Sequence, residues 1–121
     1  MKVILDTNFI LTCIKDRIDF LSQLEEQGFE ILVPHEVLEE MKDIRKKVSR
    51  DTRIVIDVAF QLFDKENVKK VKLGRRSVDL GLIKKGREGY YIATLDAEIK
   101  GKVPKRVVIF SGKKEVGVEK G

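Results

Sequence analysis

The apolar positions of the chain fall into two kinds of pattern that alternate from one end to the other. Short apolar or alternating runs predict five strands, at residues 2–5, 30–33, 68–73, 90–94 and 106–110. Between these runs, apolar residues recur every three or four positions, which is typical of helices. The predicted helices cover residues 8–26 in two pieces, 34–48, 54–62, 77–85 and 97–102. Strands that alternate with helices indicate an α/β fold with a mostly parallel sheet covered on both faces.

The length of 121 residues fits one compact domain. We expect the domain to span residues 1–112 and residues 113–121 to form a loose C-terminal tail. The sequence shows no signal-peptide pattern and no apolar run long enough to cross a bilayer, so we expect a cytoplasmic protein with no membrane partner. Cys13 and His35 are the single cysteine and histidine, which excludes an intramolecular disulfide and the usual Cys/His zinc sites.

Four acidic residues fall where the predicted elements meet one edge of the sheet. Asp6 ends the first strand and Asp96 follows the fourth, and ligands of open α/β sheets bind beyond the carboxyl ends of strands. Glu40 lies on the flank of an apolar helical stripe, and Asp79 lies in the first turn of the helix after the third strand. We therefore expect the four carboxylates to converge on this edge.

Carboxylates that converge in this way repel one another unless cations neutralise them. A set of hard oxygen ligands without His or Cys suits Mg²⁺ or Mn²⁺. Such ions hold a phosphodiester, activate a water and stabilise the leaving oxygen. Taken singly, each acid also has an ordinary structural role: a turn residue for Asp6, a solvated helix position for Glu40, and a helix N-terminal charge or cap for Asp79 and Asp96. Their joint placement is what predicts a metal site.

The motifs that carry these acids resemble those of the PIN (PilT N-terminus) domain family over nearly the whole chain. In chain order they are Leu5-Asp6-Thr7-Asn8, Val33-Pro34 with Val37-Leu38-Glu39-Glu40-Met41, Val78-Asp79, and Ile92-Ala93-Thr94-Leu95-Asp96. The resemblance implies a single PIN-like domain with a five-stranded sheet of order 3-2-1-4-5. It also implies that Asp6, Glu40, Asp79 and Asp96 are the catalytic, metal-binding acids. The residues in supporting positions would be Thr7, Asn8, Thr94 and Glu98.

The function implied by the resemblance is that of a metal-dependent endoribonuclease acting on single-stranded RNA, with ribosomal-RNA processing as the favoured role. The net charge of +5 suits a polyanionic substrate, and the candidate RNA-binding residues are Lys42, Arg45, Lys46, Arg75 and Arg76. One alternative is a VapC-type toxin paired with an antitoxin. Another is a catalytically silent PIN module that binds RNA or protein, because Asp79 stands alone and Leu95 precedes the fourth acid. A homodimer and a ribosome-assembly partner are also compatible with the family.

Two other uses of strand-end aspartates fit the sequence poorly. A phospho-acceptor receiver domain carries a paired acid after its first strand and an acceptor Asp after its third, whereas Asp6 stands alone and Gly74 follows Leu73. A phosphatase of the haloacid-dehalogenase type needs an acid two residues after Asp6, where this chain has Asn8.

Overall fold

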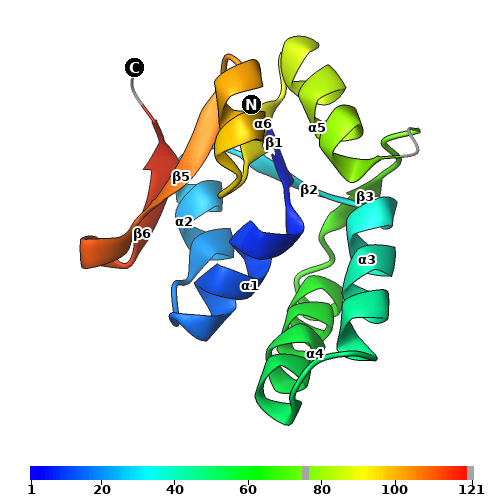
Figure 1. Ribbon diagram of the computed structural model, residues 1–121. Coiled ribbons are helices and arrows are strands. Elements are labelled where there is room, and N and C mark those ends of the chain that lie inside the picture. The colour runs from blue at the N-terminus through cyan, green and yellow to red at the C-terminus, as the bar shows by residue number, and fades with distance from the viewer. Residues whose placement is uncertain (75–76, 120–121) are drawn as a thin grey trace.

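The computed structural model describes residues 1–74 and 77–119. Its elements follow the predicted alternation (Figure 1). The strands are β1 (Lys2–Leu5), β2 (Glu30–Pro34), β3 (Lys69–Val71), β4 (Tyr91–Ala93), β5 (Arg106–Phe110) and β6 (Glu115–Val118). The helices are α1 (Thr7–Lys15), α2 (Phe20–Glu26), α3 (His35–Arg45), α4 (Arg50–Lys65), α5 (Val78–Arg87) and α6 (Ala97–Lys102), with a 3-10 turn, η1, at Ser111–Lys113.

The strands form one sheet of order β3-β2-β1-β4-β5-β6. The first five strands run parallel, which confirms the predicted α/β class and the order 3-2-1-4-5. β6 is an additional strand that pairs antiparallel with β5, from Val107 opposite Val118 to Phe110 opposite Glu115. The expectation of a loose tail from residue 113 onward was therefore wrong for Glu115–Val118.

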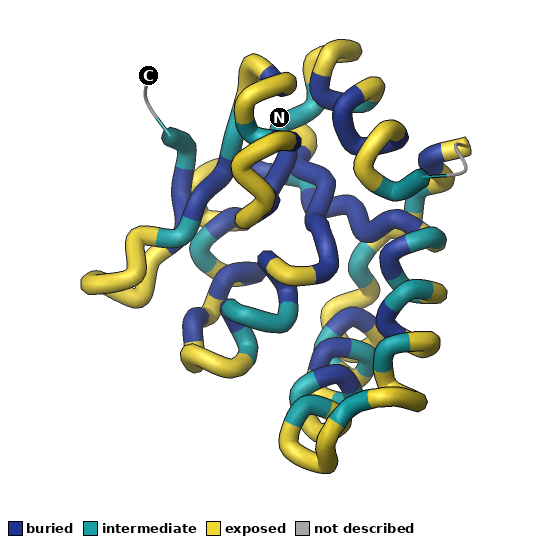
Figure 2. The backbone as a smooth tube through the Cα atoms, in the orientation of Figure 1, coloured by how far each residue is buried: buried dark blue, intermediate teal, exposed yellow. Residues whose placement is uncertain are grey.

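The sheet is covered on both faces, and β1 shows why. Val3 and Leu5 belong to the larger hydrophobic cluster, which α1 to α4 cover, whereas Ile4 belongs to the smaller cluster under α5 and α6. Successive side chains of a strand point to opposite faces, so a continuous apolar run is what a doubly covered strand requires. Figure 2 shows β1 and its neighbours β2 and β4 as buried along most of their length.

Close contacts fix the helices on the smaller face. A β-carbon at Gly81 of α5 would lie 2.7 Å from the Cβ atom of Leu73, and one at Gly86 would lie 2.5 Å from a methyl carbon of Val103. The two glycines therefore let α5 pack closely against Leu73, which follows β3, and Val103, which follows α6. Any larger residue at these positions would prevent this approach. Within the described residues, none of the helices has both the length and the apolar character that crossing a membrane requires.

Candidate functional site

Asp6 lies at the centre of the predicted acidic edge, where β1 ends and α1 begins. It is 8% exposed and caps α1, since its Oδ1 atom accepts a hydrogen bond of 2.8 Å from the backbone N–H of Thr7. Its Oδ2 atom accepts a second hydrogen bond, also of 2.8 Å, from the hydroxyl of buried Thr94. The register of β1 with β4 places Leu5 opposite Ala93. The residues that follow them, Asp6 and Thr94, therefore lie side by side just beyond the sheet edge.

The electrostatics of Asp6 connect it to two of the other predicted acids. Burial raises the pKa of the Asp6 carboxyl above its usual value, and the hydrogen bonds from Thr94 and Thr7 offset part of that effect. The negative charges of Glu40 and Asp79 raise the pKa further. Asp6, Glu40 and Asp79 therefore share one electrostatic neighbourhood, although they come from β1, α3 and α5.

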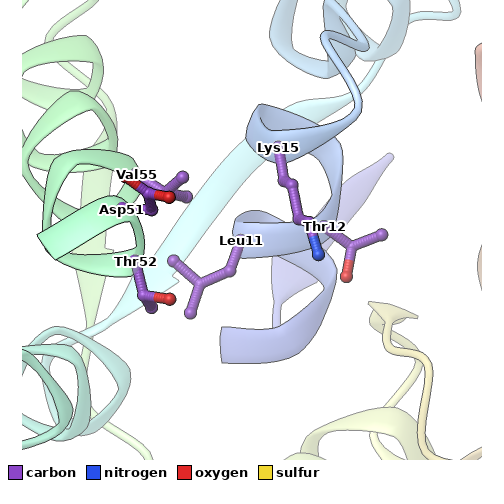
Figure 3. A pocket seen from close by; sticks show the side chains of 6 residues that line it. All are labelled: Leu11, Thr12, Lys15, Asp51, Thr52 and Val55. Carbon is purple, nitrogen blue, oxygen red and sulfur yellow. The ribbon is translucent and has the colours of Figure 1, made fainter. Parts of the chain in front are cut away.

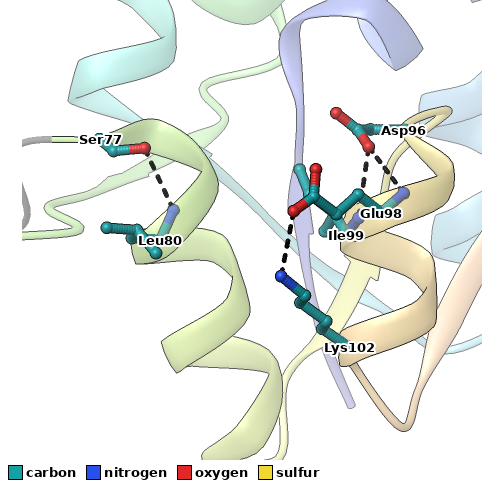
Figure 4. Close-up of polar contacts among 6 residues, drawn as sticks. All are labelled: Ser77, Leu80, Asp96, Glu98, Ile99 and Lys102. Atoms are coloured by element: carbon teal, nitrogen blue, oxygen red, sulfur yellow. Dashed lines mark hydrogen bonds and ion pairs between the residues drawn. The ribbon is translucent and has the colours of Figure 1, made fainter.

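Asp96 joins this edge through Thr94 and through its own helix. Its backbone N–H donates a hydrogen bond of 3.1 Å to the Thr94 hydroxyl oxygen, which makes Thr94 a bridge between Asp6 and Asp96. The Oδ1 atom of Asp96 accepts hydrogen bonds from the backbone N–H groups of Glu98, at 2.8 Å, and Ile99, at 3.3 Å (Figure 4). Asp96 is thus the N-cap of α6, and its exposed carboxylate keeps Oδ2 free of hydrogen bonds within the described residues.

The predicted supporting residues differ in what they contact. Thr7 is 2% exposed, and its hydroxyl oxygen is buried without a hydrogen-bond partner among the described residues. Asn8 is exposed in the first turn of α1. The Glu98 carboxylate forms an ion pair of 3.0 Å with Lys102, one turn along α6. Thr7 and Glu98 contact the acids through their backbone N–H groups, whereas Thr94 contacts both Asp6 and Asp96 through its side-chain hydroxyl.

The donor set of this edge suits a hard divalent cation. Asp6, Glu40, Asp79 and Asp96 offer only carboxylate oxygens, the ligands that Mg²⁺ and Mn²⁺ prefer. Burial is the main cause of the raised Asp6 pKa, and a cation here would offset the smaller contribution from the negative charges of Glu40 and Asp79. As the side chains are placed in residues 1–74 and 77–119, no three acidic, His or Cys side chains lie close enough together to hold a metal ion. Glu40 is half-buried and Asp79 is exposed.

The predicted RNA-binding cations on α3 and at its C-terminal cap, Lys46, are already paired with carboxylates. Arg45 makes a bidentate contact with Asp57 of α4, at 2.7 and 3.0 Å. Lys42 pairs with Glu39 at 3.0 Å, and Lys46 with Asp43 at 3.9 Å. Arg75 and Arg76 lie outside the described residues. Lys47, Arg50 and Arg53 have no ion-pair partner in the part of the chain that the structure describes, and the sequence analysis did not select them.

Glu36 is a further residue that the sequence analysis did not assign to the site. Both of its carboxylate oxygens accept hydrogen bonds of 3.1 Å from the backbone N–H of Leu73, and Oε2 accepts one of 3.2 Å from that of Gly74. Gly74 has a φ of +71°, a left-handed conformation that favours glycine. Glu36 thus ties the first turn of α3 to the segment that leads toward Asp79. Its place in the first turn after Pro34 was the available signal, because backbone-binding carboxylates are common there.

Comparison with known proteins adds a family and a fold. A family model described as a PIN like domain matches residues 3–111 of the chain. A search of curated proteins gave no match. Among solved structures, that of the PIN domain endonuclease Utp24 is similar, with a TM-score of 0.75 and 18% sequence identity. The comparison covers 98% of this chain and 90% of that one. At that identity the structural likeness shows a shared fold.

Proposed function

Because this chain belongs to the PIN-like domain family, we propose that it is a metal-dependent endoribonuclease that hydrolyses phosphodiester bonds of single-stranded RNA. The observation that carries the proposal is the contact of Thr94 with both Asp6 and Asp96 beside the charges of Glu40 and Asp79. The negative charges of Glu40 and Asp79 act on Asp6, and no joint structural role of these carboxylates offsets that repulsion. A cation that binds a phosphodiester would give them one.

In this proposal, Asp6, Glu40, Asp79 and Asp96 hold Mg²⁺ or Mn²⁺, which neutralises phosphate charge and lowers the pKa of water. Thr94 fixes the orientation of Asp6 by donating to its Oδ2 atom. The backbone N–H of Thr7 fixes the other oxygen, so Asp6 is held rigid before substrate arrives. Asn8, exposed beside Asp6, provides an amide that can hydrogen bond to a phosphate oxygen.

We infer a housekeeping role in RNA processing, with ribosomal RNA as the favoured substrate, rather than a toxin role. Toxins of the VapC type often have a longer helical stretch between the second and third acids. Here the described residues between α3 and β3 form one helix, α4. A cognate antitoxin that binds the chain tightly and blocks cleavage would contradict this role.

The substitution Asp96→Asn gives a clean test of the proposed function. Asparagine caps helices about as well as aspartate, so the variant keeps the cap of α6 while losing the charge. We expect cleavage of a labelled single-stranded RNA in Mn²⁺ or Mg²⁺, no cleavage in EDTA, and a loss of more than about 100-fold in the variant, beyond the cost typical of residues that only orient ligands. Glu115→Gln, an exposed position on β6, is the matched control and should cleave normally.

Two outcomes would contradict the proposal. Full activity of Asp96→Asn would remove this residue from the site. Absence of cleavage by the folded wild-type protein with either metal would favour a silent RNA-binding module.

A further inference from the structure

A pocket of about 400 Å³ opens between α1 and α4. Six residues from the two helices line it: Leu11, Thr12, Lys15, Asp51, Thr52 and Val55. Figure 3 shows Leu11 projecting from α1 toward Thr52 of α4, so the two helices supply opposite walls. None of the acids in the proposed metal site lines this pocket, so it is a separate feature of the surface.

The pocket is connected to the acidic edge by α1 itself. Asp6 caps this helix, whose first residue is Thr7. Because an α-helix rises 1.5 Å per residue, Leu11 lies about 6 Å and Lys15 about 12 Å beyond Thr7 along the helix axis. The nucleotide next to a phosphate held at Asp6 can span the distance from Thr7 to Leu11. A strand that leaves the acidic edge along α1 therefore passes over the pocket.

The lining of the pocket combines two apolar walls with polar groups at its rim. Leu11 and Val55 are half-buried and present methyl groups from α1 and α4. The Thr12 hydroxyl makes no hydrogen bond within the described residues, and the Thr52 hydroxyl has one long contact of 3.4 Å, with Ser49. A nucleobase has the matching character, since its faces are apolar and its edge carries donors and acceptors.

The charged residues at the rim of the pocket limit further the kind of ligand that the pocket suits. Lys15 and Asp51 are exposed, and neither forms an ion pair within residues 1–74 and 77–119. Lys15 suits a backbone phosphate. Asp51 repels phosphate but accepts a hydrogen bond from an amino group, as acidic side chains do from cytosine N4. Lys15 and Asp51 together therefore suit a whole nucleotide whose base carries an amino group better than they suit a free anion.

We propose that the pocket between α1 and α4 holds one unpaired nucleobase that carries an exocyclic amino group. The base belongs to the RNA strand whose backbone lies at Asp6, and Asp51 reads its amino group. This inference rests on the proposed function and extends it, because it names a recognition site that selects both for single strands and for a base. A base in a duplex stays stacked between its neighbours, so only an unpaired base that leaves the stack can enter the pocket.

The test measures RNA binding separately from cleavage, in the Asp96→Asn background with Mg²⁺ present. Short oligocytidines with a single abasic nucleotide moved along the strand keep every phosphate and remove one base. Fluorescence anisotropy should show weaker binding at one position, by about fivefold or more, since base packing against a side chain is worth roughly 1–3 kcal/mol. A uridine at that position should also bind more weakly than a cytidine.

Asp51→Asn should abolish the preference for cytidine over uridine at that position, whereas the control Asp64→Asn, an exposed acid near the other end of α4, should keep it. In parallel, cytidine 5′-monophosphate added to the wild-type protein should shift the methyl NMR signals of Leu11 and Val55. Equal binding of all abasic oligonucleotides, or unshifted methyl signals, would overturn the pocket assignment. RNA binding with this pattern but without cleavage by the wild-type protein would instead sink the nuclease proposal and leave the base site standing.

Discussion

Asp6 combines burial, two hydrogen bonds and two negative neighbours in a single side chain. Its raised pKa means that the folded state holds the Asp6 proton more tightly than the unfolded state does. Ionised Asp6 therefore lowers the free energy of unfolding at neutral pH. That cost disappears as the pH falls through the raised pKa toward the ordinary value of 3.8. In the proposed metal site, this loss of stability would accompany a charged Asp6 that is already oriented to bind a cation.

The substitution Asp6→Asn should separate stability from activity. Asparagine still accepts from the Thr7 N–H and removes the charge near Glu40 and Asp79. We expect a melting temperature at pH 7 equal to or above that of the wild type, with the difference shrinking as the pH falls toward 3.8, and we expect cleavage to fall by more than about 100-fold. Thermal denaturation at several pH values measures the effect on stability, and a cleavage assay measures the effect on activity. A variant that is less stable at pH 7 would show that the hydrogen bonds of the carboxylate outweigh its burial.

The positions of the acids could be predicted from the sequence better than the contacts that their side chains make. Asp6 and Asp96 could be placed because strand ends are visible in the apolar pattern. That Asp96 also caps α6 was foreseen as an alternative, and the structure shows that cap. The pairing of Lys42 with Glu39 follows helical spacing and was open to prediction. The contact of Arg45 with Asp57 was not, since it depends on how α3 packs against α4.

At the scale of elements, Glu36 links the start of α3 to the segment after β3. Burial raises the pKa of the Glu36 carboxyl, but the backbone N–H groups of Leu73 and Gly74, together with that of Glu36 itself, outweigh burial and lower it overall. A lowered pKa means that Glu36 stabilises the fold above its ordinary value of 4.5 and that this contribution is lost as the pH falls below it. The link bears on the proposed function because this segment precedes α5, which carries the proposed ligand Asp79.

The substitution Glu36→Gln should therefore weaken the protein in a pH-dependent way. We expect the free energy of unfolding to fall by about 1 kcal/mol at pH 7, a value reduced for solvent screening, and the difference to vanish below the Glu36 pKa. Cleavage should fall as well, because Asp79 is less firmly positioned. Urea denaturation at several pH values measures the first effect. Glu39→Gln, an exposed acid on the same helix, is the control. A stability difference that is constant with pH would rule out the charged link.

Strand β6 marks the limit of what the local pattern of apolar residues could predict. Glu115–Val118 is short and contains Gly117, so it has little strand signal of its own. Its support comes from α2, nearly a hundred residues away in sequence. The side chain of Gln23 accepts from the N–H of Val116, at 2.8 Å, and donates to the carbonyl oxygen of Lys114, at 3.1 Å. Gln27 donates to the carbonyl oxygen of Val116 at 2.9 Å. Such long-range contacts are absent from any local window of the sequence.

At the scale of the whole molecule, β6 is the edge strand of the sheet on the side away from β3. Val116 is 3% exposed and belongs to the larger core, and the pairing of β6 covers the edge of β5. The acidic edge lies at the ends of β4 and β1, which are two and three strands away from β6. The strand β6 is therefore separate from the proposed catalytic site, and we expect stability and cleavage to respond differently when β6 is removed.

Removal of residues 113–121 tests this separation. The truncated chain loses the burial of Val116, worth about 1.5–3 kcal/mol, and leaves Gln23 and Gln27 without their backbone partners. It also exposes the edge of β5, which favours association between chains. We expect a lower denaturation midpoint and more aggregate in sedimentation, with metal-dependent cleavage retained by the soluble fraction. A chain ending at Val118 keeps β6 and is the control. Loss of cleavage by folded, monomeric truncated protein would mean that β6 also supports the acidic edge, through β5 and β4.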